Sequence, residues 1–340
     1  MAKRDIIVVG GSAGSLEALK ALVANLPANL AASVFIVIHL TPARESLLPH
    51  ILNRAGRMPA FQPLDQERIE YGQIYVAPPD RHLVLENRHI SLIHGPKENR
   101  TRPAIDPLFR SAATNYGRRV IGVLLSGSLD DGTAGLRAIK QRGGVTIVQD
   151  PNEALYPSMP ESAIYNNAID HIVKANAIAP LLRQLVEAEI DKKEEVSAMS
   201  GDFRKEDELA KQQLQPAEMI NTTDDLGELS MFTCPECQGT LWELKDGELL
   251  RYRCHVGHAY SIDSLDAGQG EKLESALWSA LRALEERGAL ARRLAQQSRE
   301  RQRQGLAERF EQRAGEADEH AESIRRILLT DPEKALSLER

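Results

Sequence analysis

The sequence has few cysteines, few aromatic residues and no long apolar run. Its 340 residues include only 3 cysteines, and aromatic residues make up 4%. All the cysteines lie between positions 234 and 254, which excludes a framework of several disulfides. Nothing approaches the roughly 18 consecutive apolar residues that a membrane-spanning helix needs, and no export signal is recognisable. These absences favour a cytoplasmic protein.

The sequence also lacks a basic stripe. It has 42 Lys and Arg against 49 Asp and Glu, a formal net charge of −7. Residues 1–190 carry a net charge of +2, and residues 191–340 carry one of −9. A net-acidic chain without a basic surface argues against nucleic acid as the main partner. Its length also predicts more than one domain.

Apolar runs alternate with helical patterns in the first half of the chain. Buried strands are predicted where apolar residues run together, at residues 6–9, 34–38, 120–125, 145–148 and 171–173. Leucines at helical spacing predict a helix over about residues 16–26, and residues 74–93 predict an antiparallel hairpin. Strands that alternate with helices predict an α/β fold with a doubly wound, mostly parallel, Rossmann-like sheet.

Polar residues stand where three of the predicted strands end, namely Ser12, His39 and Asp131. The carboxyl ends of parallel strands share one edge of a sheet, so these residues are expected to converge there. Their types are those of a nucleophile, a general base and the carboxylate that orients the base. Backbone N–H groups at the following helix and near Ser128 would stabilise an oxyanion. The combination predicts a serine hydrolase.

Each of these residues has another explanation when it is taken alone. Ser12 could cap a helix, His39 could be a core histidine, and Asp131 could be a turn residue. Asp130 competes with Asp131 for the acid role. The glycine-rich turn lacks the G-x-G-x-x-G spacing of a dinucleotide site and the Gly-Lys-Ser/Thr of a phosphate loop. Only the presence of all three residues at strand ends favours the hydrolase.

Six stretches between about residues 5 and 186 form a recognisable set, namely IVVGGSAG (7–14), IHL (38–40), YVAPPDRH (75–82), NRTRPAIDPLF (99–109), LSGSLDDG (125–132) and MPESAI (159–164). Together they resemble the CheB-type protein-glutamate methylesterase domain. The resemblance implies an esterase that removes methyl esters from glutamates of chemoreceptor helices, with glutamine deamidation as a further activity. It implies Ser12 as nucleophile, His39 as base and Asp131 as acid, with no catalytic cofactor. Asp131 is preferred because it occupies the acid position of the family's G-x-D-G pattern.

The resemblance also implies a partner, a methylated chemoreceptor or similar helical protein, so that contact with membranes is peripheral. Two departures concern substrate fit: Ala13 stands where the family often has a hydroxyl residue, and Ser128 where methionine is usual. We also expect no receiver domain before the esterase domain, and therefore no phosphorylation switch in cis. The alternative is a non-catalytic signalling adaptor that uses the esterase fold as a scaffold and binds partners through the second half.

The second half contains a compact cysteine and histidine pattern. Two ligand pairs flank a hairpin predicted over residues 240–244 and 249–253, which is the plan of a zinc ribbon. The predicted ligands of a structural zinc ion are Cys234, Cys237, Cys254 and His258, with His255 as the alternative to His258. A redox-active Cys-x-x-Cys would need a strand-to-helix setting that is missing here.

The predicted domains are residues 1–186 for the methylesterase domain, 187–230 for an acidic and polar linker, 231–268 for the zinc ribbon, and 269–330 for a helical tail. The tail is rich in Ala, Leu, Glu, Arg and Gln and has no proline before Pro332. It predicts two long helices that part near Gly305. Leucines at spacings of three, four and six fit an amphipathic helix in an antiparallel hairpin, and a homodimer through this tail is the alternative.

Overall fold

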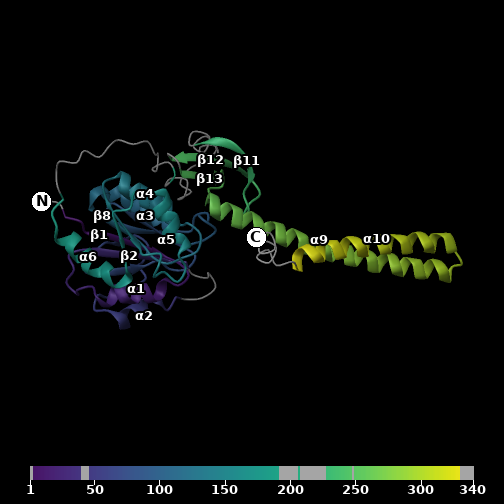
Figure 1. Ribbon diagram of the computed structural model, residues 1–340, viewed down its shortest axis with the longest axis horizontal. Helices are drawn as coiled ribbons and strands as arrows, with labels where there is room; N and C mark the ends of the chain where they lie inside the picture. Colours follow the sequence, from purple (N-terminus) through teal and green to yellow (C-terminus); the bar gives the residue numbers. More distant parts are fainter. Residues whose placement is uncertain (1–2, 40–45, 191–205, 207–226, 247–248, 330–340) are drawn as a thin grey trace. The chain divides into compact units, whose positions relative to one another are not determined.

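The computed structural model describes residues 3–39, 46–190, 206, 227–246 and 249–329 (Figure 1). The chain divides into two compact units, Met1–Leu265 and Asp266–Arg340. Most of the predicted linker lies outside the described residues. No helix among the described residues is long and apolar enough to cross a membrane.

A parallel sheet of seven strands forms the centre of the first unit, in the order β10-β9-β8-β1-β2-β5-β3. The strands are β1 (Ile6–Gly11), β2 (Ser33–Ile38), β3 (Ala60–Phe61), β5 (Ile74–Val76), β8 (Val120–Leu124), β9 (Val145–Gln149) and β10 (His171–Val173). The predicted parallel α/β sheet is thereby confirmed. The chain builds outward from β1 in both directions, so the strand order reverses between β1 and β8. Such a switch point is where open α/β sheets bind ligands.

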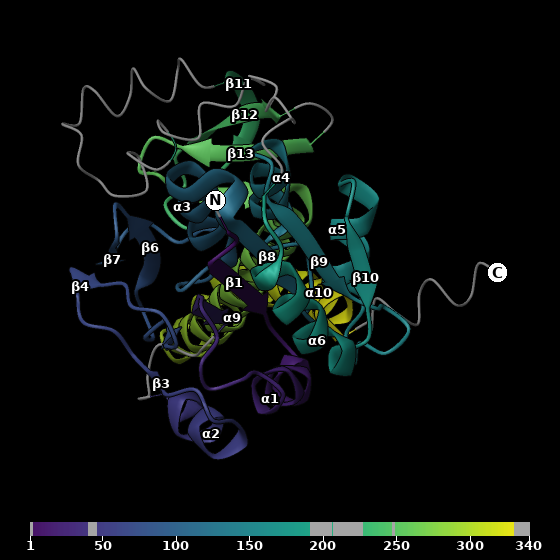
Figure 2. The ribbon, with the colours of Figure 1, turned by 90° about the vertical axis from the view of Figure 1, so that its left-hand side faces the viewer.

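Helices cover both faces of this sheet because its strands are apolar on both sides. In β1, Ile7 and Val9 face a core shared with α1, α2 and α6, whereas Ile6 and Val8 face a core shared with α3, α4 and α5. Figure 2 shows the two helix layers on opposite sides of β1 and β8. The helices are α1 (Ser15–Ala24), α2 (Leu48–Ala55), α3 (Ile105–Tyr116), α4 (Thr133–Gln141), α5 (Ser158–Asn166) and α6 (Ala175–Glu187), with a 3-10 turn η1 (Gly117–Arg119).

Two smaller antiparallel sheets complete the first unit. The first has the order β4-β7-β6, from β4 (Glu67–Arg68), β6 (His82–Glu86) and β7 (His89–Ile93). Its β6–β7 pair is the expected hairpin, but the hairpin does not begin at Ile74, because residues 74–76 form the parallel strand β5. The second, which we call the ribbon, has the order β11-β12-β13-β14, from β11 (Glu228–Thr233), β12 (Thr240–Asp246), β13 (Leu249–Cys254) and β14 (Ala259–Ser261). The small core of the ribbon includes Leu241, Tyr252, Tyr260 and Leu265.

The second unit is an antiparallel pair of helices, formed by α9 (Ile262–Glu300) from Asp266 onward and by α10 (Gln304–Leu329). Ion pairs join the helices at steps of two helical turns, and they are Glu285–Arg325, Arg292–Asp318 and Arg299–Glu311. Successive ion pairs are seven residues further along α9 and seven residues back along α10, so the two helices keep one register along their length. Buried alanines line the contact, as Ala291 and Ala295 do in α9.

The helix boundaries differ from those expected. Helix α9 begins at Ile262, before the predicted start of the tail at residue 269, and the helices part at residues 301–303. Gly305 lies inside α10, and a Cβ added to it would have no heavy atom within 4 Å. The composition of residues 262–268 is too mixed to reveal that they are helical.

Candidate active site and metal centre

The predicted catalytic side chains come from loops at the carboxyl edge of the main sheet. Ser12 follows β1, His39 follows β2, and Asp131 lies between β8 and α4. Small residues allow these loops to come close together. Gly14 adopts a left-handed conformation with a φ of 73°, and a Cβ added to Gly127 would lie 3.0 Å from the Cβ of Ser12.

One imidazole joins the three predicted residues. His39 Nδ1 lies 3.0 Å from Ser12 Oγ, and His39 Nε2 lies 2.8 Å from Asp131 Oδ2. Because an ionised carboxylate only accepts hydrogen bonds, Nε2 carries the proton and Nδ1 accepts from the Ser12 hydroxyl. The structure therefore brings Ser12, His39 and Asp131 into one hydrogen-bonded chain, which is the geometry of a nucleophile, a base and an orienting acid.

The alternative explanations do not match this geometry. Helix α1 has Gly14 as its N-cap and receives no side-chain cap, so Ser12 does not cap it. The His39 side chain remains 16% exposed, so it is reachable from solvent. The carboxyl group of Asp130 points to Ser261 instead of His39.

The Asp131 carboxylate is held by donors on both oxygens. Besides His39, it accepts from the backbone N–H groups of Ile105 and Asp106 in the first turn of α3, and from Nδ2 of Asn99. Burial alone would raise the pKa of Asp131, but the hydrogen bond and the charge interaction with His39, helped by these donors, hold it below its usual value. Asp131 therefore stays charged at neutral pH and can orient His39.

Two residues of this network were not predicted from the sequence. Asn99 donates to the carboxyl groups of both Asp131 and Asp106. Burial, followed by the charge of Asp131, raises the pKa of Asp106, whose other oxygen accepts from the backbone of Gly132 and Gly135. Both residues lie in a stretch that carries the family resemblance, but nothing in their type or spacing assigns them to the site.

Backbone N–H groups are present in the two loops that meet at Ser12. The N–H groups of Ser12 and Gly127 are already bonded to the carbonyl oxygens of Ser126 and Tyr156. The N–H groups of Ala13 and Ser128 donate to no acceptor among the described residues. They are the candidates for oxyanion stabilisation, and they come from the two loops named in the prediction.

A groove of about 510 Å³ lies beside Asp130. One wall comes from α5, with Ser158, Glu161 and Tyr165, and another from Leu250 of the ribbon strand β13. The ribbon thus forms part of the surface next to the catalytic loop.

The ribbon gathers the predicted metal ligands. Donor atoms of Cys234, Cys237, Cys254 and His258 all lie within 4.8 Å of one another. Tetrahedral zinc with ordinary bond lengths holds two sulfurs about 3.8 Å apart, and a sulfur and a nitrogen about 3.6 Å apart. The sulfurs of Cys237 and Cys254 lie 3.7 Å apart, and Nδ1 of His258 lies 3.6 Å from the sulfur of Cys254. The donor set therefore fits a zinc ion.

His255, the alternative ligand, lies elsewhere. Its ring contacts the ring of Trp242, with 3.8 Å between the ring centroids, and it is absent from the ligand cluster.

A Ser–His–Asp arrangement at the carboxyl edge of a doubly wound sheet is the geometry expected of a serine hydrolase. The chain belongs to the CheB methylesterase family, because residues 7–182 match the sequence pattern of that family.

Comparisons with individual proteins agree with this assignment. A putative protein-glutamate methylesterase/protein-glutamine glutaminase of Leptospira interrogans is 36% identical over 182 residues, which cover 53% of this chain and 94% of that protein. Protein-glutamate methylesterase/protein-glutamine glutaminase 2 of Anaeromyxobacter dehalogenans is 34% identical over 184 residues, 54% of each chain. The CheB methylesterase catalytic domain of Thermotoga maritima, a crystal structure, superposes with a TM-score of 0.52 at 31% identity, covering 55% of this chain and 100% of that one.

Proposed function

We propose that this chain hydrolyses methyl esters of glutamate side chains on a chemoreceptor-like helical protein. The observation that carries the proposal is the bridging position of His39, between the Ser12 hydroxyl and the Asp131 carboxylate. Membership of the CheB methylesterase family supplies the substrate class. The proposal includes glutamine deamidation, because similar proteins are named for both activities.

The proposed mechanism uses only residues of the chain. His39 Nδ1 accepts the proton of Ser12 as Oγ bonds to the ester carbonyl carbon, and Asp131 stabilises the imidazolium. The N–H groups of Ala13 and Ser128 donate to the oxyanion. The bond to the methoxy oxygen then breaks, and His39 returns the proton so that methanol leaves. Water attacks the acyl-enzyme in the same way, which releases the glutamate carboxylate and restores Ser12.

Methanol release from receptor membranes with radiolabelled methyl esters tests this proposal. The unaltered chain should release methanol, and Ser12→Ala should reduce the rate by orders of magnitude. Ser323→Ala is the matched control, because this exposed serine on α10 bonds only within its own helix. Equal and slow release by the unaltered chain and Ser12→Ala would instead favour the adaptor, in which ribbon and helices bind a partner.

We further propose that Cys234, Cys237, Cys254 and His258 hold a structural zinc ion. The support is the closed set of three thiols and one imidazole at tetrahedral spacing. The ribbon core is small, so the metal should contribute much of its folding free energy. Thiolate ligands persist in a reducing compartment, which supports a place in the cytosol.

We also propose that the second unit pairs with a second copy of the chain. The alanines between α9 and α10 are buried by the helix pair itself, but the larger apolar side chains of Leu273, Trp278 and Leu290 on α9 remain exposed. Sedimentation equilibrium tests the pairing, and a Trp278→Glu variant should shift the chain toward monomer. A monomeric unaltered chain at micromolar concentration would contradict it.

A further inference from the structure

The ribbon is docked on the α/β domain by backbone hydrogen bonds within the first unit. Asn99 N donates to the carbonyl oxygen of Ala259 at 2.8 Å, and Ala259 N donates to the carbonyl oxygen of Lys97 at 3.3 Å. Ala259 is the first residue of β14 and directly follows the candidate metal ligand His258. The edge strand β14 of the ribbon is therefore hydrogen-bonded to residues 97–99, and Asn99 of this segment contacts the candidate acid Asp131.

A buried charge cluster reinforces this contact. The Glu98 carboxylate accepts two hydrogen bonds from Arg110 of α3, at 2.7 and 3.0 Å, and one from Arg253 of β13, at 3.0 Å. Glu206 binds Arg251 with both oxygens and also reaches Arg253. All five side chains are buried. Such a cluster fixes the ribbon in one orientation, because any shift would leave buried charges without partners.

The side chain of Asn99 links the ribbon to the triad. Its Nδ2 donates to Asp131 Oδ1 at 2.8 Å and to Asp106 Oδ2 at 2.9 Å. Its Oδ1 accepts from Ser261 N and from Ser264 Oγ, both at 3.0 Å. Both N–H donors and the oxygen of this buried amide are therefore hydrogen-bonded. The donors from Ser261 and Ser264 fix the position of Oδ1, and this directs Nδ2 toward the two carboxyl groups.

We propose that Ser261 and Ser264 are positioning residues of the esterase. The Ser264 hydroxyl and the Ser261 N–H hold the Asn99 amide, and the Ser261 hydroxyl holds Ser264 by accepting from its N–H. Asn99 in turn holds the Asp131 carboxylate, and Asp131 holds His39 toward Ser12. The inference rests on the proposed function, and it makes the ribbon a required part of the catalytic machinery. It also predicts that unfolding of the ribbon weakens the His39–Asp131 hydrogen bond and lowers the rate of methanol release, although no residue of the α/β domain is altered.

Kinetics of a double variant, Ser261→Ala with Ser264→Ala, test the proposal in the full chain. A misplaced orienting group should lower kcat for methanol release by about tenfold or more, with little change in KM. Ser264→Thr, which keeps the hydroxyl, should retain most of the rate. Ser230→Ala is the matched control, because this ribbon serine bonds only within the ribbon, at Leu241 O and at the N–H of Phe232.

A spectroscopic measurement separates this proposal from the proposed activity. The proton on His39 Nε2 is deshielded by its hydrogen bond to Asp131 and should give a far-downfield NMR signal that a His39→Gln variant lacks. The signal should weaken in the double variant and after treatment with a zinc chelator, and it should return when zinc is restored. An unchanged signal and an unchanged kcat in the double variant would overturn the positioning role. A responsive signal in a chain that hydrolyses no ester would leave that role standing and contradict the proposed function alone.

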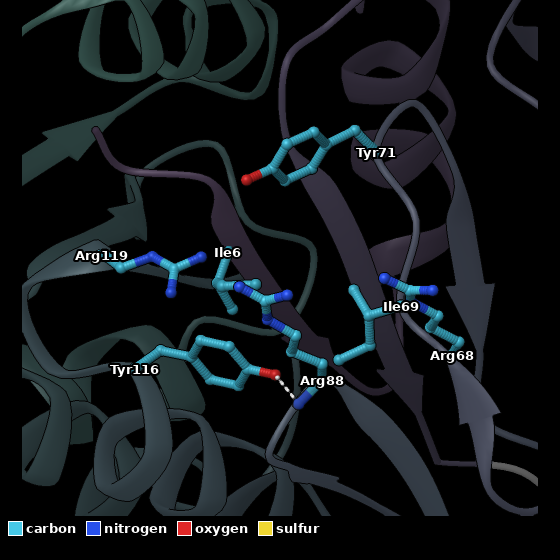
Figure 3. A pocket seen from close by; sticks show the side chains of 7 residues that line it. All are labelled: Ile6, Arg68, Ile69, Tyr71, Arg88, Tyr116 and Arg119. Carbon is cyan, nitrogen blue, oxygen red and sulfur yellow. Dashed lines mark hydrogen bonds between the residues drawn. The ribbon is translucent and has the colours of Figure 1, made fainter. Parts of the chain in front are cut away.

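A second, independent feature is a basic pocket of about 220 Å³ at the opposite edge of the sheet. Its lining includes Arg68, Arg88, Arg119, Tyr71 and Tyr116, together with Ile6 at the start of β1 (Figure 3). The catalytic Ser12 follows the other end of that strand. The two sites are therefore separated by the length of β1.

The arginines of this pocket differ in their partners. Arg119 is paired with Asp5, which accepts from two of its nitrogens. Arg68 and Arg88 form no ion pair among the described residues, although both line the pocket. Figure 3 shows the guanidinium groups of Arg88 and Arg119 turned toward the same space beside Tyr116. The Tyr116 oxygen accepts from the backbone of Arg88, so its hydroxyl proton is available to a ligand.

We propose that this pocket binds a small organic phosphate. Guanidinium groups match phosphate oxygens in geometry, and the tyrosine and isoleucine surfaces suit an attached ring. Calorimetry of the full chain with adenosine monophosphate should show binding that weakens at least tenfold in Arg88→Ala. Arg54→Ala, which removes an exposed charge from α2, should bind as the unaltered chain does. No heat with adenosine monophosphate or with inorganic phosphate would overturn the proposal, as would equal affinity in Arg88→Ala.

Discussion

The hydroxyl group of Ser261 donates a hydrogen bond to the carboxyl group of Asp130. Ser261 belongs to the ribbon, and Asp130 is the chain neighbour of the candidate catalytic acid. Asp130 is buried, and this burial raises its pKa to about 7 although the Ser261 hydroxyl opposes the shift. The folded chain therefore keeps a proton on Asp130 at a pH where an unfolded aspartate has lost it.

Asp130 should make the stability of the chain fall as the pH rises from about 4 to 7. In that window the folded state binds one proton more than the unfolded state, so the free energy of unfolding decreases by up to about 1.4 kcal/mol per pH unit. Asp130→Asn should flatten this part of the profile. Urea unfolding at pH 5, 6 and 7 measures the effect, with the exposed Asp266→Asn as control. Parallel profiles for Asp130→Asn and the unaltered chain would contradict the assignment.

Replacement of the orienting acid should stop turnover without unfolding the site. Asp131→Asn removes the charge that stabilises the His39 imidazolium and disturbs the tautomer, and the expected loss in kcat is about 10³ to 10⁴-fold. Because Asp130 does not contact His39, Asp130→Asn should cost much less. Methanol release by both variants makes the comparison. The reverse order of effects would move the acid role to Asp130.

The buried carboxylate of Glu98 should be worth more to stability than any exposed pair at the ribbon contact. Burial alone would raise its pKa, but the charges of Arg110 and Arg253 hold the pKa of Glu98 far below its usual value. Glu98→Ala leaves both guanidinium groups buried without that partner, and it should cost about 3–5 kcal/mol of unfolding free energy. Chemical unfolding followed by circular dichroism measures this loss.

The matched control is the exposed pair of Lys97 and Glu236, whose atoms lie 3.0 Å apart across the same contact. Lys97→Ala should cost less than about 1 kcal/mol, because water screens such a pair. Equal losses for Glu98→Ala and Lys97→Ala would mean that the cluster does not fix the ribbon.

Local sequence patterns were sufficient to predict five strands of the parallel sheet and to propose Ser12, His39 and Asp131 as residues at their carboxyl ends. Buried parallel strands are apolar throughout, so residues such as Ile6 to Val9 are visible in the sequence, and the edge where strands end is shared by topology. For that reason His39 could be predicted to lie near Ser12, although 27 positions separate them in the sequence. Helix ends were less visible: α9 begins at Ile262, directly after β14, where Ser264 N donates to the Ser261 hydroxyl.

The network around Asn99 could not be predicted in the same way. Its partners Ser261, at the end of β14, and Ser264, in the first turn of α9, lie more than 160 positions away, so no periodicity relates them to Asn99. Glu98 and Arg253 likewise look like ordinary surface charges in the sequence. Their burial follows from the docking of the ribbon, which only the tertiary structure shows.

Metal analysis of histidine variants should identify the fourth ligand of the ribbon. His258 Nδ1 lies at zinc-site distance from Cys254, whereas the ring of His255 contacts Trp242. His258→Ala should therefore reduce the zinc content well below one ion per chain, and His255→Ala should retain it. Cys237→Ser should lose zinc as well, because thiolates bind zinc far better than hydroxyls do. Since metal binding is coupled to folding, both zinc-poor variants should also lose the signal of Trp242, which is buried in the ribbon, from near-UV circular dichroism. Full zinc content in His258→Ala together with zinc loss in His255→Ala would exchange the two roles.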